Sequence, residues 1–129
     1  MANAAQNKVS LLIVAQDQFT AVLIEDTLNN YTLTVKKTFK GKEALTYSLN
    51  NRVDLLITGL LLPDMPGKDL IAEIREHAGR PGPEIIVFTS APEMLSEEDK
   101  KKYRILNVLE KPLDDISVFE EMVKGITER

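Results

Sequence analysis

Two residues that could take part in polar chemistry stand at the ends of buried apolar segments. Thr89 closes the run Glu84–Thr89, and Lys111 follows the run Ile105–Leu109 and precedes Pro112. Each has an ordinary explanation on its own, because a threonine hydroxyl can bond to nearby backbone and a lysine can extend its ammonium to water. As a pair at the ends of apolar runs, they point to a site at one edge of a sheet.

Few carboxylates accompany this pair. Asp17 follows the first apolar run, Asp64 lies in the loop after the third, and Glu110 is adjacent to Lys111. A Mg²⁺ site draws on several oxygen ligands, so isolated acids make a poor one. Asp17 is expected to cap a helix, since aspartate is a preferred first cap residue. Asp64 lies in a turn-forming sequence and is expected to be solvated. No cofactor and no Mg²⁺ binding are expected.

Several enzyme classes lack their motifs here. The segment Ala15-Gln-Asp-Gln18 contains no glycine, which argues against dinucleotide, P-loop and flavin sites at that point. The sequence contains no Gly-x-Ser-x-Gly motif. It has no cysteine and one histidine, His77, so a thiolate zinc site and a cysteine nucleophile are excluded. We therefore expect that the protein is not an enzyme.

The composition is that of an ordinary globular domain. The chain has 129 residues, with 16 Lys+Arg against 20 Asp+Glu, for a net charge of −4. A net negative charge argues against nucleic-acid binding, which needs a basic face. The basic run Lys36–Lys42 is interpreted as a solvated loop. The apolar runs are too short to span a bilayer and the first residues are polar, so a cytoplasmic location without a membrane partner is expected.

Five apolar runs alternate with five stretches of helical period, and these elements must position the polar residues. Most runs are apolar on successive residues, as in strands covered on both faces, whereas Leu33–Lys37 alternates and is placed near an edge. The runs are Val9–Ala15, Leu33–Lys37, Val53–Thr58, Glu84–Thr89 and Ile105–Leu109. The helical stretches are residues 19–28, 42–49, 68–77, a segment from Ser96, and 115–126. The expected apolar stripe of the first consists of Phe19, Val22, Leu23, Ile24 and Leu28.

This alternation predicts an α/β fold. We expect a single doubly wound (βα)5 domain of flavodoxin-like type, with a parallel five-stranded sheet and helices on both faces. The domain is expected over residues 8–129, after a flexible tail of residues 1–7. Ligands of such sheets bind beyond the carboxyl ends of the strands. Thr89 and Lys111 are therefore expected to meet at that edge.

Three segments carry a resemblance to a known family. They are residues 54–67, which contain Pro63 and Gly67, residues 85–90 ending near Thr89, and residues 109–112 around Lys111. Over about residues 8–127 the chain resembles a response-regulator receiver domain, the phosphoacceptor module of two-component signalling. The resemblance implies a cis bond between Lys111 and Pro112.

The chain departs from that family at its chemical landmarks. The family's phosphoacceptor aspartate falls on Gly59, its acidic pair falls on Ala15 and Gln16, and its switch aromatic falls on Val108. A shift of one residue would place Gln16 and Asp17 on the acidic pair instead. An acyl phosphate needs a carboxylate nucleophile and a metal ion to offset charge. The resemblance therefore implies a degenerate receiver, or pseudo-receiver, that is not phosphorylated at the usual site.

The function expected from this resemblance is signalling through protein–protein interaction. A histidine kinase or an output domain is the expected partner, and a homodimer is a further expectation. The interaction face implied by the family is formed by Leu95, Lys101, Tyr103, Asn107 and Val118.

Two alternatives stay open. The first is a phosphorelay receiver that uses another acceptor, Asp17 or Asp64. The second is a domain that senses a small ligand or anion, because uncharged residues replace the carboxylates while the lysine remains. A small anion such as sulfate or phosphate, or a carboxylate from a partner or from Asp17, would then occupy the pocket. Its expected contacts are Gly59, Leu60, Thr89 and Lys111.

Overall fold

Five parallel strands form one sheet in the order β2-β1-β3-β4-β5. The computed structural model describes residues 9–28, 33–77, 82–111 and 117–127. The predicted tail of residues 1–7 and the Lys111–Pro112 bond lie outside these ranges. The strands are β1 (Val9–Val14), β2 (Leu33–Thr38), β3 (Leu55–Thr58), β4 (Glu84–Thr89) and β5 (Ile105–Glu110). As predicted, the alternating segment around β2 is an edge strand.

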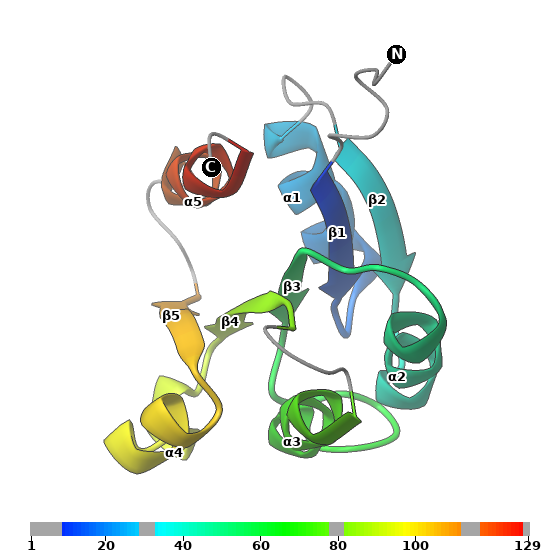
Figure 1. Ribbon diagram of the computed structural model, residues 1–129. Coiled ribbons are helices and arrows are strands. Elements are labelled where there is room, and N and C mark those ends of the chain that lie inside the picture. The colour runs from blue at the N-terminus through cyan, green and yellow to red at the C-terminus, as the bar shows by residue number, and fades with distance from the viewer. Residues whose placement is uncertain (1–8, 29–32, 78–81, 112–116, 128–129) are drawn as a thin grey trace.

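Helices cover both faces of the sheet. They are α1 (Gln18–Thr27), α2 (Gly41–Asn50), α3 (Gly67–His77), α4 (Glu97–Lys102) and α5 (Ser117–Thr127), with a short 3₁₀ turn η2 (Pro92–Met94) before α4. Figure 1 shows α1 and α5 on one face and α2, α3 and α4 on the other. The predicted doubly wound (βα)5 architecture is thereby confirmed.

Successive strand residues enter opposite halves of the core. In β1, Leu11 and Ile13 pack in the half that contains α1 and α5, whereas Leu12 and Val14 pack in the half that contains α2 and α3. Side chains alternate across a strand, so a central parallel strand must be apolar at every position to fill both halves. This requirement explains the unbroken apolar runs of the sequence.

The predicted apolar stripe of α1 is wrong in part. Ala21, Ile24 and Leu28 are buried, but Phe19 is 76% exposed and Leu23 is 38% exposed. A helix turns by about 100° per residue, so positions 21, 24 and 28 share one face and positions 19 and 23 lie opposite. The sheet therefore covers one face of α1 and leaves a second, apolar face uncovered by the described residues.

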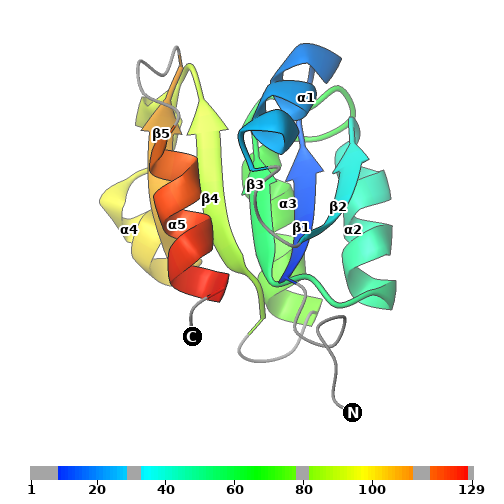
Figure 2. The ribbon, with the colours of Figure 1, turned by 90° about the horizontal axis from the view of Figure 1, so that it is seen from above.

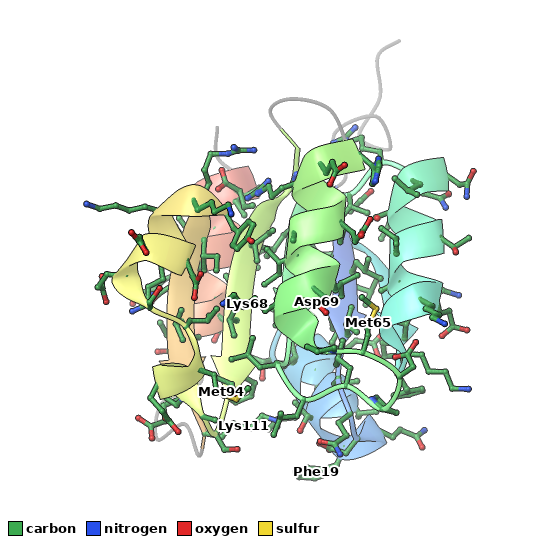
Figure 3. All side chains as sticks on the ribbon, turned by 90° about the horizontal axis from the view of Figure 1, so that it is seen from below. Phe19, Met65, Lys68, Asp69, Met94 and Lys111 are labelled. Carbon is green, nitrogen blue, oxygen red and sulfur yellow. The ribbon has the colours of Figure 1, made fainter. Side chains whose placement is uncertain are left out.

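One arginine fixes the α4–β5 corner to α3. The Arg75 guanidinium donates to the carbonyls of Pro83 at 2.7 Å, Tyr103 at 2.7 Å and Arg104 at 3.0 Å. Burial lowers the pKa of Arg75. Near the start of α3, the Lys68 ammonium (labelled in Figure 3) lies 3.0 Å from the Asp99 carboxylate and joins α3 to α4. These contacts hold the segment before β5, and α4, against α3.

Searched over the described residues, the chain contains no helix that is both long enough and apolar enough to cross a bilayer.

Thr38 provides a test of the packing at the end of β2. It is fully buried, and its Oγ1 has no hydrogen-bond partner among the described residues. Burying an unpaired hydroxyl costs free energy, so the near-isosteric Thr38→Val should raise the free energy of unfolding by about 1 kcal/mol in urea denaturation. Thr58→Val is the matched control. The equally buried Thr58 hydroxyl donates to the Gly59 carbonyl at 2.9 Å, so that variant should lose stability. Equal effects of both variants would contradict the assignment.

Candidate functional site

A small pocket of about 40 Å³ lies at the carboxyl ends of the strands. Figure 2 shows the strands running in one direction, so that their ends gather at one edge of the sheet. The pocket is lined by residues from the ends of β1, β3, β4 and β5, among them Ala15, Gln16, Gly59, Leu60, Thr89 and Lys111. The sequence-based expectation that Thr89 and Lys111 meet at this edge agrees with the structure.

Backbone hydrogen bonds continue past the strand ends and bring these residues together. The Gly59 amide donates to the Val14 carbonyl at 3.0 Å, which places Gly59 beside Ala15. The Lys111 amide donates to the Thr89 carbonyl at 2.9 Å. The relative positions of the pocket residues are therefore set by main-chain pairing and not by their own side chains.

Lys111 has an aromatic neighbour but no ion-pair partner in the described part of the chain. Its Nζ lies 5.1 Å from the centre of the Phe88 ring, and no described carboxylate oxygen lies within 4.0 Å of it. A ring face attracts a cation, although more weakly than a carboxylate at hydrogen-bond distance does. Phe88 in turn packs edge-on against Phe119 of α5, with ring centres 5.3 Å apart.

Thr89 is buried beneath the same pocket. Only 3% of its surface is exposed, and its Oγ1 accepts a hydrogen bond from the Ala91 amide at 3.0 Å. A hydroxyl that accepts one bond still carries a proton to donate. The pocket thus combines an ammonium and a hydroxyl donor.

Gly59, which follows β3, and Gly67, which begins α3, differ in whether the surrounding backbone leaves room for a side chain. A Cβ on Gly59 would meet only the Phe88 carbonyl oxygen at 3.7 Å, an ordinary contact, and Gly59 is not in the left-handed region. A Cβ on Gly67 would collide with the Gly59 carbonyl oxygen. Backbone geometry therefore requires glycine at 67 but has room for a side chain at 59.

Residues 11–123 match the response regulator receiver domain family. The chain belongs to that family.

The receiver has curated relatives of about twice its length. It is 29% identical over 104 residues to the response regulator ArlR of Staphylococcus saprophyticus, covering 81% of this chain and 46% of that protein. It is 30% identical over 105 residues to ArlR of Staphylococcus epidermidis, covering 81% and 47%. The chain thus spans about half the length of the curated relatives that it matches.

Solved receiver structures share the fold. The REC domain of AraT, a response regulator from Geobacillus stearothermophilus, is 27% identical with a TM-score of 0.78 and covers 93% of each chain. A CheY-like receiver domain from Methylobacillus flagellatus has a TM-score of 0.79 at 23% identity, covering 92% of this chain and 98% of its own.

Asp17 caps a helix, as the sequence predicted, and is not among the residues that line the pocket of the receiver. Its Oδ1 accepts from the Thr20 amide at 2.7 Å and its Oδ2 from the Thr20 hydroxyl at 2.9 Å. The Thr20 amide lowers the pKa of Asp17, and the charge of Lys111 adds to the effect. Ala15 and Gln16, by contrast, line the pocket.

The expectation for Asp64 was incomplete. Its carboxylate is exposed, but it accepts from the backbone amides of Gly41 at 2.7 Å and Lys42 at 3.0 Å and so caps α2 from a distant loop. The Lys42 amide contributes most to lowering the pKa of Asp64. The signal for this distant cap was Lys40, which precedes α2 and makes no side-chain cap, so that the first amides of α2 need another acceptor.

The predicted interaction face needs one correction. Leu95 is only 4% exposed and packs into the core beside α3, because the η2 turn directs it inward. Lys101 and Asn107 are exposed, and Tyr103 and Val118 are partly buried. Val108, at the position of the family's switch aromatic, is also partly buried and packs against the α3 side of the core. Of the predicted residues, those fully exposed on this face are therefore polar, and Leu106 of β5, which is 46% exposed, adds an apolar side chain that was not predicted.

Exposed apolar side chains near the pocket were not predicted. Leu61 is 53% exposed and Met94 is 48% exposed, and both contribute to a shallow hollow that also includes Gln16 and Leu60. In the sequence these residues are indistinguishable from core residues, because their exposure depends on how the loops after β3 and β4 fold.

The cap at α1 yields a pH-dependent prediction. Asp17→Ala should lower the free energy of unfolding by about 1 kcal/mol near neutral pH. Asp17→Asn should keep most of the stabilisation from the cap, because asparagine also caps helices. A carboxyl with a depressed pKa contributes stability above its unfolded value, 3.8, and loses it as the pH falls through the folded value. Asp17→Asn should therefore flatten the decline below about pH 4 in urea denaturation. If the free energy of unfolding of Asp17→Asn declined below about pH 4 as steeply as that of the unmodified protein, the assignment of Asp17 as a charged cap would be contradicted.

Proposed function

We propose that this receiver domain signals through protein–protein contacts without phosphorylation at residue 59. One observation carries the proposal: the pocket retains Thr89 and Lys111 but has Ala15, Gln16 and Gly59 where the family's carboxylates fall. Such a domain is a pseudo-receiver. A histidine kinase, an output domain or a second copy would dock on its surface.

The chemistry of the pocket supports this proposal. Gly59 offers no nucleophile, and the neighbouring Thr58 hydroxyl is buried and donates to the Gly59 carbonyl. Mg²⁺ needs several oxygen ligands, and the described residues contain no group of three His, Asp or Glu side chains that could hold a metal. Because Ala15 and Gly59 have no side-chain oxygen, the residues present do not fit a Mg²⁺ ion.

The α4–β5 corner supports an interaction role. Arg75 and the Lys68–Asp99 pair hold this corner against α3 without any contact to the pocket. A surface fixed in this way needs no phosphoryl group to order it. Lys101 and Asn107 on it remain exposed and available to a partner.

The alternative acceptors are less well suited. Phosphoryl transfer to Asp17 or Asp64 would use an oxygen that now accepts a hydrogen bond at the start of a helix. Losing such a cap costs about 1 kcal/mol in general. Both carboxylates nevertheless lie near the same edge, and the experiment below distinguishes them.

The proposal predicts no acyl phosphate. Incubation with acetyl phosphate and excess Mg²⁺, followed by intact-mass analysis, should leave the protein without an acid-labile phosphate, because residue 59 has no carboxylate. A stoichiometric adduct would overturn the proposal. If that adduct were lost in Asp17→Asn or in Asp64→Asn, the variant that lost it would identify the acceptor.

Restoring the carboxylates should restore a metal site only when all are present. Gly59→Asp fits the available space, but alone it supplies too few oxygens. The triple variant Ala15→Asp, Gln16→Asp, Gly59→Asp should bind Mg²⁺ at least about tenfold more tightly than Gly59→Asp alone, as measured by calorimetric titration. A triple variant with asparagine at the same positions is the matched control and should not bind. Equal Mg²⁺ affinity of the single and triple aspartate variants would show that Ala15 and Gln16 are not the metal-ligand positions.

A further inference from the structure

Exposed apolar side chains lie at the same end of the molecule as the pocket. Phe19 of α1 is 76% exposed, Leu61 after β3 is 53% exposed and Met94 after β4 is 48% exposed. Figure 3 shows Phe19, Met94 and Lys111 at the same end of the molecule. We call Phe19, Leu61 and Met94 the apolar rim. Leu61 lines the pocket and shares a neighbouring hollow with Met94. Exposed apolar side chains beside a polar pocket are typical of a binding surface.

The pocket beside this rim has donors without an acidic acceptor. Lys111 supplies an ammonium with no described carboxylate oxygen within 4.0 Å, and Thr89 supplies a hydroxyl. The Leu60 amide donates to no described acceptor, whereas the Gly59 amide is taken by Val14. Gly59 therefore contributes space and not the contact expected from the sequence. A group of such donors favours an anion.

The pocket is small, at about 40 Å³. A carboxylate carries two acceptor oxygens, which match the donors of Lys111 and Thr89. It is also smaller than sulfate or phosphate, and the phosphate titration described below distinguishes these anions.

The described chain does not place its own carboxylate there. Asp17 is near enough for the charge of Lys111 to lower its pKa, but its oxygens accept from Thr20 in the α1 cap and it does not line the pocket. A free carboxylate such as acetate would leave the apolar rim in water. An acidic side chain carried by a polypeptide would let its apolar neighbours cover the rim.

We propose that the pocket binds an aspartate or glutamate side chain of a protein partner, with apolar residues beside that acid packing on Phe19, Leu61 and Met94. This inference rests on the proposed function and gives it a docking chemistry. The partner's carboxylate takes charge-assisted hydrogen bonds from Lys111 and Thr89. The partner thus supplies in trans the negative charge that residue 59 lacks.

The test uses the full chain labelled with ¹⁵N and two probes. Acetylated, amidated tripeptides Leu-Asp-Leu and Leu-Asn-Leu are titrated at fixed ionic strength while amide shifts are followed. Leu-Asp-Leu should shift Leu60, Thr89 and Lys111 and bind at least about tenfold more tightly than Leu-Asn-Leu, a ratio typical of a charged hydrogen bond. Acetate and inorganic phosphate are titrated in parallel, and both should bind more weakly than Leu-Asp-Leu.

Variants separate the polar and apolar contributions. Lys111→Gln should remove the preference for aspartate over asparagine. Lys102→Gln, which changes an exposed lysine at the end of α4, should leave that preference unchanged. Phe19→Ser should weaken Leu-Asp-Leu but not acetate, because only the peptide reaches the rim. Since Phe19 is exposed, this variant should keep the fold.

Other outcomes would overturn the inference. Equal affinity for the two tripeptides, or no amide shift at Leu60, Thr89 and Lys111, would show that the pocket does not bind an acidic side chain. Phosphate binding tighter than the aspartate peptide would replace it with a tetrahedral anion. The acetyl phosphate experiment is independent of these results, so an adduct there would overturn the pseudo-receiver proposal by a different measurement.

Discussion

Parallel pairing of β1, β3, β4 and β5 is the constraint on which the rest of this structure depends. Each strand hydrogen-bonds to its neighbour in register, and the pairing runs one residue beyond the strands, from Gly59 to Val14 and from Lys111 to Thr89. Residues far apart in the sequence are thereby held side by side whatever their side chains are. The pocket persists as a backbone feature, and its chemistry is decided afterwards by which side chains occupy it.

The site combines a retained cation with missing anions. In proteins a lysine near the end of a buried strand usually finds a carboxylate or reaches water, since an unpaired charge is costly to bury. Lys111 has Phe88 for a neighbour, and that ring rests against Phe119 of α5. A ligand that binds the Lys111 ammonium therefore lies next to the Phe88–Phe119 contact, which joins the pocket to the C-terminal helix α5.

Much of the fold could be predicted from the sequence because the core imposes strong patterns. Strands filled on both faces produce unbroken apolar runs, and Asp17 was recognisable as a cap because capping is a local interaction. The Asp64 cap on α2 was not predictable in the same way, because it joins residues 23 positions apart. The exposure of Phe19 was missed because the face of α1 that meets the sheet depends on packing and not on hydrophobicity alone.

The room beside Gly59 has a consequence for how this position changes over generations. A side chain there meets no obstacle beyond an ordinary contact with the Phe88 carbonyl, whereas one at Gly67 would push against the loop itself. Most substitutions at residue 67 therefore destabilise the fold itself, whatever the domain binds. Substitutions at residue 59 do not, so the identity of this residue is left to selection on what the pocket binds. The fold accepts either an acidic or a neutral residue at position 59, so a receiver can gain or lose its acceptor there without other changes to the domain.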